Sequence, residues 1–295
     1  VLSRRRDDGP PPAPAPRQTF RHFPVRGPLQ RSYSLAATSL GEDATVRVVC
    51  YGDSNTWGLD AFKGDAMRRF KHPWPRVLAR KLGPGYDVVS EGLNGRTTMV
   101  DDTFMSDYEV NGRRTLPPIL HSHKPIDVLV IMLGTNDLKK HLNLSPQLIA
   151  RGAATLANDA MRMDVWRSTP RVLLVCPVNI RQPPPSCRFA YSFEGGAAKA
   201  PACAKHYRAE AEALGVAFLD ANEATQIPDP RHGGDGIHLS AQNCADLGGA
   251  VASKVQEMLT GSFDETAPGD FLALNSVTAS LMGWSQYGKL PSLHE

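Results

Sequence analysis

The feature that most constrains this fold is an alternation of short apolar runs with segments of helical periodicity. Five runs are almost continuously apolar, which is typical of parallel strands that are covered on both faces. They lie at residues 46–51, 86–90, 127–133, 171–176 and 216–220. Apolar residues recur at helical spacing in the segments 74–82, 145–160, 199–214 and 241–259. Strands that alternate with helices predict an α/β fold with a doubly wound parallel sheet.

A serine stands just beyond the first apolar run, in Gly52-Asp53-Ser54. Open α/β sheets bind their ligands at the carboxyl ends of the strands, so this hydroxyl is well placed to meet a substrate. A serine hydroxyl is inert unless a base takes its proton, and the base needs a partner that orients it. Asp235 and His238 lie three residues apart and have the spacing for that pair. The sequence therefore indicates a serine hydrolase.

Each of these residues also has a plainer interpretation. Ser54 could simply cap the helix that follows it, which is a common role for serine. His232, Asp235 and His238 lie close enough together in the sequence to suggest a metal site. A metal site would leave Ser54 and Asn136 without a role, so we expect no metal and no organic cofactor.

Four sequence blocks follow one another along the chain: Gly52-Asp53-Ser54, Glu91-Gly92-Leu93-Asn94-Gly95-Arg96-Thr97-Thr98, Gly134-Thr135-Asn136-Asp137 and Asp235-Gly236-Ile237-His238. In this order they resemble the SGNH (GDSL-type) hydrolase superfamily, and longer stretches resemble its bacterial arylesterase/acyltransferase branch. The resemblance covers about residues 46–259. It implies a three-layer α/β/α sandwich of flavodoxin-like type with a five-stranded parallel sheet.

The resemblance also implies an oxyanion hole. Its donors would be the backbone N–H groups of Ser54 and Gly95 and the side-chain amide of Asn136. A glycine at position 95 has no Cβ to keep its backbone donor from the substrate. Asn136 could instead be an ordinary turn residue after a strand. Asp53 and Asp137 are expected to brace their loops through backbone hydrogen bonds.

Two further residues are candidates for the substrate pocket. Trp57 stands one helical turn beyond Ser54 and would either form a wall of the acyl pocket or belong to the core. Arg96 would either brace the oxyanion loop or lie in solvent. In the enzymes that the chain resembles, the region corresponding to residues 182–199 shapes the substrate channel and the subunit contacts.

The composition excludes several classes of function. The chain has 33 Lys and Arg against 30 Asp and Glu, a formal charge of +3, which is too balanced to indicate binding to nucleic acid. No run approaches eighteen consecutive apolar residues, so no membrane span is expected. Neither a GxxxxGK[ST] loop nor a GxGxxG fingerprint after the first strand is present, which argues against a nucleotide-binding enzyme. The expected partner is a small-molecule ester, and a homo-oligomer is left open.

The chain divides into three parts by composition. Residues 1–43 are rich in Arg and Pro and are expected to be disordered, because they cannot bury enough apolar area to offset the entropy of ordering. Arginine-rich, acid-poor N-termini also describe transit peptides, so a mitochondrial or plastid address is the alternative to a cytoplasmic one. Residues 44–260 are expected to form the hydrolase domain, and residues 261–295 a C-terminal tail.

The expected function is hydrolysis of small aryl or short-chain acyl esters through an acyl-enzyme on Ser54, with acyl transfer to alcohols as a further activity. A carbohydrate O-acetyl esterase or a lysophospholipase of the same superfamily is the enzymatic alternative. A flavodoxin-like binding protein without catalytic activity is the alternative from another class.

Overall fold

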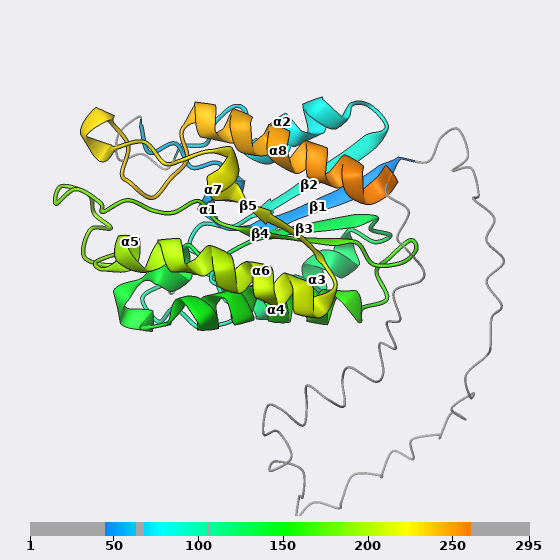
Figure 1. Cartoon of the computed structure of the whole chain (residues 1–295), viewed down its shortest axis with the longest axis horizontal. Coiled ribbons are helices and arrows are strands. Elements are labelled where there is room, and N and C mark those ends of the chain that lie inside the picture. Colours follow the sequence, from blue (N-terminus) through cyan, green and yellow to red (C-terminus); the bar gives the residue numbers. More distant parts are fainter. Residues whose placement is uncertain (1–44, 63–67, 106, 261–295) are drawn as a thin grey trace, which may run out of the picture. The chain divides into compact units, whose positions relative to one another are not determined.

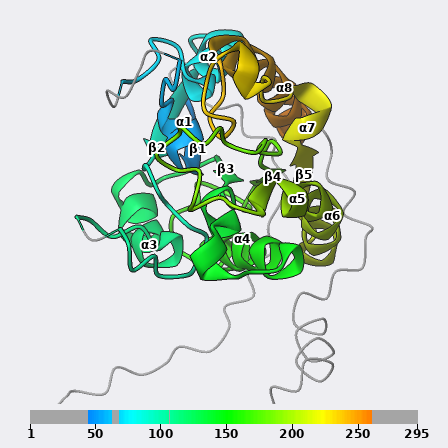
Figure 2. The same cartoon turned by 90° about the vertical axis from the view of Figure 1, so that its left-hand side faces the viewer.

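The computed structural model describes residues 45–62, 68–105 and 107–260. The expected N-terminal extension and C-terminal tail lie outside these residues. Five parallel strands form one sheet in the order β2-β1-β3-β4-β5 (Figure 2). Their bounds are Val46–Gly52 (β1), Tyr86–Gly92 (β2), Val128–Met132 (β3), Val172–Cys176 (β4) and Ala217–Asp220 (β5).

Helices cover both faces of this sheet. Helices α2 and α8 pack together on one face, and α3, α4 and α6 lie on the other (Figure 1). The α-helices are α1 (Ser54–Trp57), α2 (Trp74–Leu82), α3 (Gly112–Ser122), α4 (Pro146–Met161), α5 (Gly196–Lys199), α6 (Cys203–Leu214), α7 (Ala221–Ala224) and α8 (Ala241–Thr260). Four 3₁₀ helices are η1 (Asn136–Leu138), η2 (Lys140–Leu142), η3 (Ala200–Ala202) and η4 (Pro230–His232). The expected three-layer sandwich with five parallel strands is confirmed.

The core lies at the middle of the sheet. Every residue of β3 and β4 is buried, which accounts for the continuous apolar runs of these strands. The outer strands β2 and β5 are only partly buried along their whole length. The sheet therefore holds its central strands rigidly, and these strands carry the loops of the site.

The strand order also fixes where a ligand can bind. The chain leaves β1 toward β2 on one side, and β3 pairs with β1 on the other side. In this order the connections diverge at the carboxyl ends of β1 and β3, which leaves a crevice at that edge. Helix α1 follows β1 directly and η1 follows β3, so Ser54 and Asn136 both begin at this point.

Two helical segments differ from the sequence-based expectation. Helix α3 was not expected, because Pro117 and Pro118 lie inside it and proline normally breaks a helix. Its Leu116 and Leu120 side chains are fully buried, and this packing outweighs the missing backbone donors. The expected helix at 199–214 is instead divided into the end of α5, η3 and α6, with Pro201 in the 3₁₀ turn between them.

Neighbouring glycines in α8 provide a test of the contact between α2 and α8. A Cβ on Gly248 would lie 2.6 Å from Val77 Cβ and 2.8 Å from the carbonyl oxygen of Trp74, whereas a Cβ on Gly249 would meet nothing within 4 Å. Gly248→Ala should therefore lower the free energy of unfolding by about 1–3 kcal/mol. Gly249→Ala should raise it by up to about 1 kcal/mol, because alanine favours a helix. Urea denaturation measures both, and changes of the same sign would contradict the packing.

Candidate active site

The three residues expected to act together are joined by two hydrogen bonds. His238 Nδ1 lies 2.6 Å from Asp235 Oδ2, and His238 Nε2 lies 2.9 Å from Ser54 Oγ. Ser54 is 6% exposed and His238 is 4% exposed. An imidazole held between a carboxylate and a hydroxyl can take the serine proton and be stabilised as it gains charge. The structure therefore brings Ser54, His238 and Asp235 into the arrangement that nucleophilic catalysis requires.

The loop before α8 fixes the direction of the imidazole. Asp235 Oδ1 accepts hydrogen bonds from the backbone N–H groups of Ile237 and His238, each at 2.9 Å. Burial raises the pKa of Asp235, but the hydrogen bond and charge of His238 outweigh it, so the pKa lies below its ordinary value. Asp235 is therefore ionised near neutral pH and can hold the N–H of the imidazole at Nδ1.

Asn55 ties the nucleophile to this loop, a role that the sequence analysis missed. Its Oδ1 accepts a hydrogen bond from the N–H of Leu239 at 3.0 Å, and its Nδ2 donates to the carbonyl of Ile237 at 3.4 Å. The residues on either side of His238 are thus bonded to the residue that follows Ser54. Its place next to the nucleophile was the only sequence signal for this role.

The expected oxyanion donors come from the ends of three adjacent strands. Ser54 begins α1 after β1, Gly95 lies in the loop after β2, and Asn136 begins η1 after β3. Asn136 Nδ2 donates to the carbonyl of Arg96 at 3.1 Å, so its amide lies against the Gly95 loop. Gly95 has a φ of +82°, and a Cβ there would lie 2.7 Å from Met105 Cε. The backbone turn and Met105 therefore require this glycine.

Arg96 lies beneath the loop and not in solvent. It is 3% exposed, and its guanidinium lies 4.1 Å from the ring centroid of Tyr51. It donates to the carbonyl of Gly52 at 2.8 Å and to that of Glu91. The alternative of a solvated arginine is wrong, because these bonds hold the ends of β1 and β2 together. Arg96 is thus placed to brace the loop, and a role for it in the substrate pocket stays a prediction.

Trp57 is the last residue of α1, and its side chain is only partly buried, so it is not part of the central core. The guanidinium carbon of Arg69 lies 5.3 Å from the centroid of the Trp57 ring. The wall nearer to the imidazole comes from the 182–199 segment, where the Phe189 ring lies 6.3 Å from that of His238. A role for Trp57 in the acyl pocket stays a prediction.

A buried ion pair that the sequence analysis did not assign joins the loops of the oxyanion hole. Lys139 Nζ lies 2.7 Å from Asp102 Oδ2, and the two side chains are 8% and 1% exposed. His141 Nε2 lies 2.9 Å from the other oxygen of Asp102. The pair links the Gly95 loop to the segment that follows Asn136. Burial acts to raise the pKa of Asp102, but Lys139 and His141 hold it below its ordinary value.

Two buried acids brace the same loops, as expected. Asp53 accepts a hydrogen bond from the N–H of Asn55 at 2.9 Å. Asp137 accepts one from the N–H of Thr98 at 3.0 Å and another from the Thr98 hydroxyl. Burial raises the pKa of each carboxyl to about 6. These groups orient the backbone near Ser54 and Asn136 at a cost in stability.

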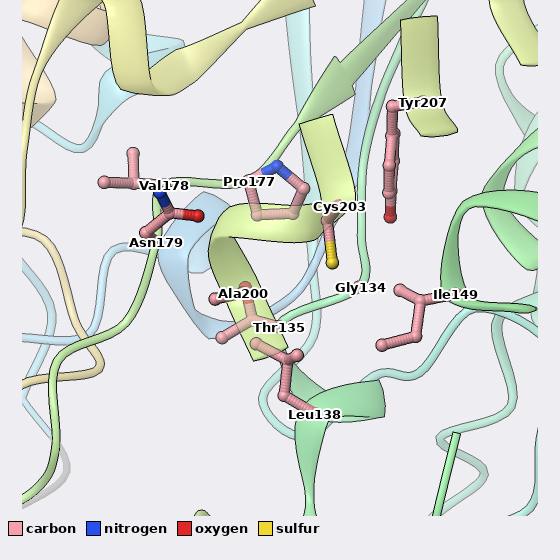
Figure 3. Close-up of a pocket in the computed structure, with 10 residues that line it drawn as sticks. All are labelled: Gly134, Thr135, Leu138, Ile149, Pro177, Val178, Asn179, Ala200, Cys203 and Tyr207. Atoms are coloured by element: carbon pink, nitrogen blue, oxygen red, sulfur yellow. The ribbon is translucent and has the colours of Figure 1, made fainter. Parts of the chain in front are cut away.

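A small cavity lies behind the end of β3, where Tyr207 and Cys203 face Gly134 and Thr135 (Figure 3). Its volume is about 10 Å³, which is too small for an acetyl group. The Tyr207 hydroxyl donates to the carbonyl of Leu133 at 2.6 Å, and a Cβ on Gly134 would lie 2.3 Å from that hydroxyl oxygen. This cavity is a consequence of how α6 packs on the strand and is no acyl pocket.

Two further searches cover the residues that the structure describes. Within them, no group of three or more His, Cys, Asp or Glu side chains is arranged to hold a metal ion. Their helices include none with the length and apolar character needed to cross a bilayer.

The buried carboxyl of Asp137 predicts a pH-dependent change in stability. Its pKa is about 6 in the folded protein against an ordinary 3.8, so the folded state binds the proton more tightly. This carboxyl therefore makes the free energy of unfolding fall as the pH rises from about 4 to about 6. For Asp137→Asn, the free energy of unfolding relative to wild type should rise by about 1–3 kcal/mol between pH 4 and pH 7.

Denaturant unfolding at a series of pH values measures this difference, and Asp101→Asn gives the control of opposite sign. Hydrogen bonds from Asn111 and Arg114 lower the pKa of Asp101, so its carboxylate adds stability as the pH rises. The same relative free energy should therefore fall as the pH rises for Asp101→Asn, and it should do so mainly below about pH 4, where the carboxyl of the unfolded chain titrates. A difference for Asp137→Asn that is independent of pH would contradict the buried, protonatable state.

Comparison with known proteins shows the family to which this chain belongs. Residues 50–242 match the model of the GDSL-like Lipase/Acylhydrolase family. The structure of Est24, a carbohydrate acetylesterase from Sinorhizobium meliloti, is similar, with 36% sequence identity and a TM-score of 0.67. The match covers 72% of this chain and 100% of the Est24 chain. The aryl esterase of M. smegmatis is also 36% identical, with a TM-score of 0.66, and the match covers 72% of this chain and 100% of the esterase chain. No curated protein matches. The chain belongs to the GDSL-like lipase/acylhydrolase family of the SGNH superfamily and is a carboxylic-ester hydrolase.

Proposed function

We propose that the chain hydrolyses small aryl and short-chain acyl esters through an acyl-enzyme on Ser54. The observation that carries this proposal is the 2.9 Å contact between His238 Nε2 and Ser54 Oγ, with Asp235 bound to the other imidazole nitrogen. Ser54 Oγ attacks the acyl carbon while His238 Nε2 takes its proton. His238 then returns the proton to the leaving oxygen, and a water molecule activated by the same imidazole hydrolyses the acyl-enzyme.

The oxyanion of the tetrahedral intermediate would receive three donors. The N–H of Ser54 lies in the first turn of α1, where backbone N–H groups have no partner within the helix. Asn136 has two N–H donors on its amide, and one of them is used on the carbonyl of Arg96. The second is therefore available to the oxyanion. Gly95 would supply the third donor from its backbone.

The preference for a small acyl group rests on the burial of the reacting atoms. Ser54 and His238 are almost wholly covered, and Phe189 stands beside the imidazole. We infer that this cover leaves room for a small acyl group and not for a long chain. Acetyl esters of sugars are the second candidate, because the similar structure from Sinorhizobium meliloti is a carbohydrate acetylesterase. A binding protein without activity is disfavoured, since such a protein would have no need of a bonded serine, histidine and aspartate.

The nucleophile is tested by replacing it. Ser54→Ala should lower kcat by roughly 10⁴- to 10⁶-fold on p-nitrophenyl acetate, because the three residues act as a unit. A fluorophosphonate probe should label the wild type stoichiometrically and leave the variant unlabelled. Ser240→Ala, next to the same loop, is the matched control and should still be labelled. Wild-type protein that is folded but neither labelled nor active would favour the binding protein.

Asn136 tests the oxyanion hole. Asn136→Ala should lower kcat by about 10²- to 10³-fold, which is the usual effect of removing one donor to the oxyanion. The loss should appear in kcat, because the donor acts on charge that exists only in the transition state. Steady-state kinetics separate the two constants. An unchanged kcat with a raised KM would mean that Asn136 only binds the substrate.

The substrate class and acyl transfer are tested together. Activity should fall along p-nitrophenyl acetate, butyrate and octanoate, and a peracetylated sugar assayed beside them tests the second candidate. With a vinyl ester and a primary alcohol in water, part of the acyl group should appear as the new ester, because the methylenes of an alcohol gain free energy against an apolar group such as Phe189 and water does not. Gas chromatography of ester and acid gives the ratio. Acid alone at high alcohol concentration would make the enzyme a plain hydrolase.

A further inference from the structure

A cationic segment at residues 68–81 lies outside the active site. It holds Arg68, Arg69, Lys71, Arg76, Arg80 and Lys81, and it contains neither Asp nor Glu. All six side chains are exposed. Since the whole chain has a formal charge of only +3, the rest of the sequence is net acidic. This segment is thus one of two cationic stretches of the sequence, the other being the Arg-rich residues 1–43.

The same segment forms one side of a second cavity, at α2 and β2. This cavity has a volume of about 240 Å³, roughly the volume of eight water molecules. Its apolar lining comes from Phe70, Pro73, Pro75, Ala79 and Val88. The polar lining is formed by the Arg69 and Arg76 side chains with the Ser90 hydroxyl. An apolar pocket with two guanidinium groups matches a ligand that has both an apolar and an anionic part.

No carboxylate in the described part of the chain forms an ion pair with any of these six cations. Within the described residues, the hydrogen bonds of the two arginines that line the cavity go to carbonyl oxygens: Arg76 donates to that of Lys71 at 3.1 Å, and Arg69 donates to that of Trp57 and also lies over the Trp57 ring. Desolvation and the charges of Arg80, Lys71 and Arg76 lower the pKa of His72. The positive charges therefore lie close to one another without an anionic partner there.

We propose that this cavity binds a small amphipathic anion, with a carboxylate or phosphate head between Arg69 and Arg76 and an apolar chain against Phe70, Pro73 and Val88. A guanidinium presents paired N–H donors to such a head, and the other N–H groups of these two arginines have no hydrogen-bond acceptor among the described residues. The lining of this cavity includes none of Ser54, His238 and Asp235, so the proposal does not depend on the ester chemistry. Its wall contacts the end of helix α1, because the N–H of Phe70 donates at 2.8 Å to the carbonyl of Gly58, the residue that follows the helix.

Isothermal titration calorimetry tests the proposal on the full chain, below the concentrations at which the ligands form micelles. Octanoate and octyl phosphate should bind at least tenfold more tightly than octanol, which lacks the charge, and than inorganic phosphate, which lacks the chain. Each methylene added between butyrate and octanoate should tighten binding about fourfold. Prior modification with a fluorophosphonate, where Ser54 reacts, removes any binding of the acids at the active site.

Three variants locate the site. Arg76→Gln should weaken octanoate binding at least fivefold, and Ala79→Phe should abolish it by filling the cavity. Arg208→Gln removes an exposed arginine from α6 on the opposite face of the sheet and should change the affinity by less than twofold (Figure 1). Thermal denaturation checks that each variant is folded. If Ala79→Phe does not fold, the affinity of Arg76→Gln for octanoate decides the test.

Three results would overturn the proposal. Equal affinity for octanol and octanoate would mean that the negative charge of the ligand does not contribute to binding. Equal weakening by Arg76→Gln and Arg208→Gln would mean that only the general charge of the protein matters. Binding to anionic phospholipid vesicles without binding of the free amphiphiles would make the segment a membrane contact.

Discussion

The hydrogen bond between His238 and Ser54 joins residues 184 positions apart, and the rest of the site is arranged so that this bond can form. Ser54 follows β1, an inner strand of the sheet, whereas His238 lies on the loop before α8. Asn55 connects the two parts, because its side chain forms hydrogen bonds from the first turn of α1 to the backbone on both sides of His238. The nucleophile and its base therefore move as one unit, which keeps the proton-transfer distance short.

The oxyanion side of the site depends on buried polar groups and not on apolar packing. Arg96, Asp53, Asp137 and the Asp102–Lys139 pair are all nearly inaccessible to water. Burying such groups costs stability even where they are paired. The fully apolar strands β3 and β4 offset that cost. In return, loops after three different strands are held by directional bonds, which fix the donors more narrowly than apolar contacts would.

The parts of this protein that follow local rules could be predicted from the sequence. The strands were found because apolar runs are continuous in a covered parallel sheet, although their ends moved by a residue or two. Helix α3 was missed because two prolines conceal it, and only the burial of Leu116 and Leu120 accounts for it. The Asp102–Lys139 pair was missed because its members lie 37 positions apart and neither matches a local pattern. Gly95 was noted, but for a reason different from the positive φ and the Met105 contact that the structure shows.

The cationic segment has a second physical interpretation that the fold itself raises. Strand β2 forms an edge of the sheet, and edges are often flanked by charged side chains that discourage pairing with another chain. Edge protection needs only charge, and it would be served equally by lysines that point away from the domain. It does not require a cavity lined by Phe70, Pro73 and Val88, nor two guanidinium groups on its wall. The charge alone is thus explained by the edge, whereas the combination of charge with an apolar cavity is explained by a ligand.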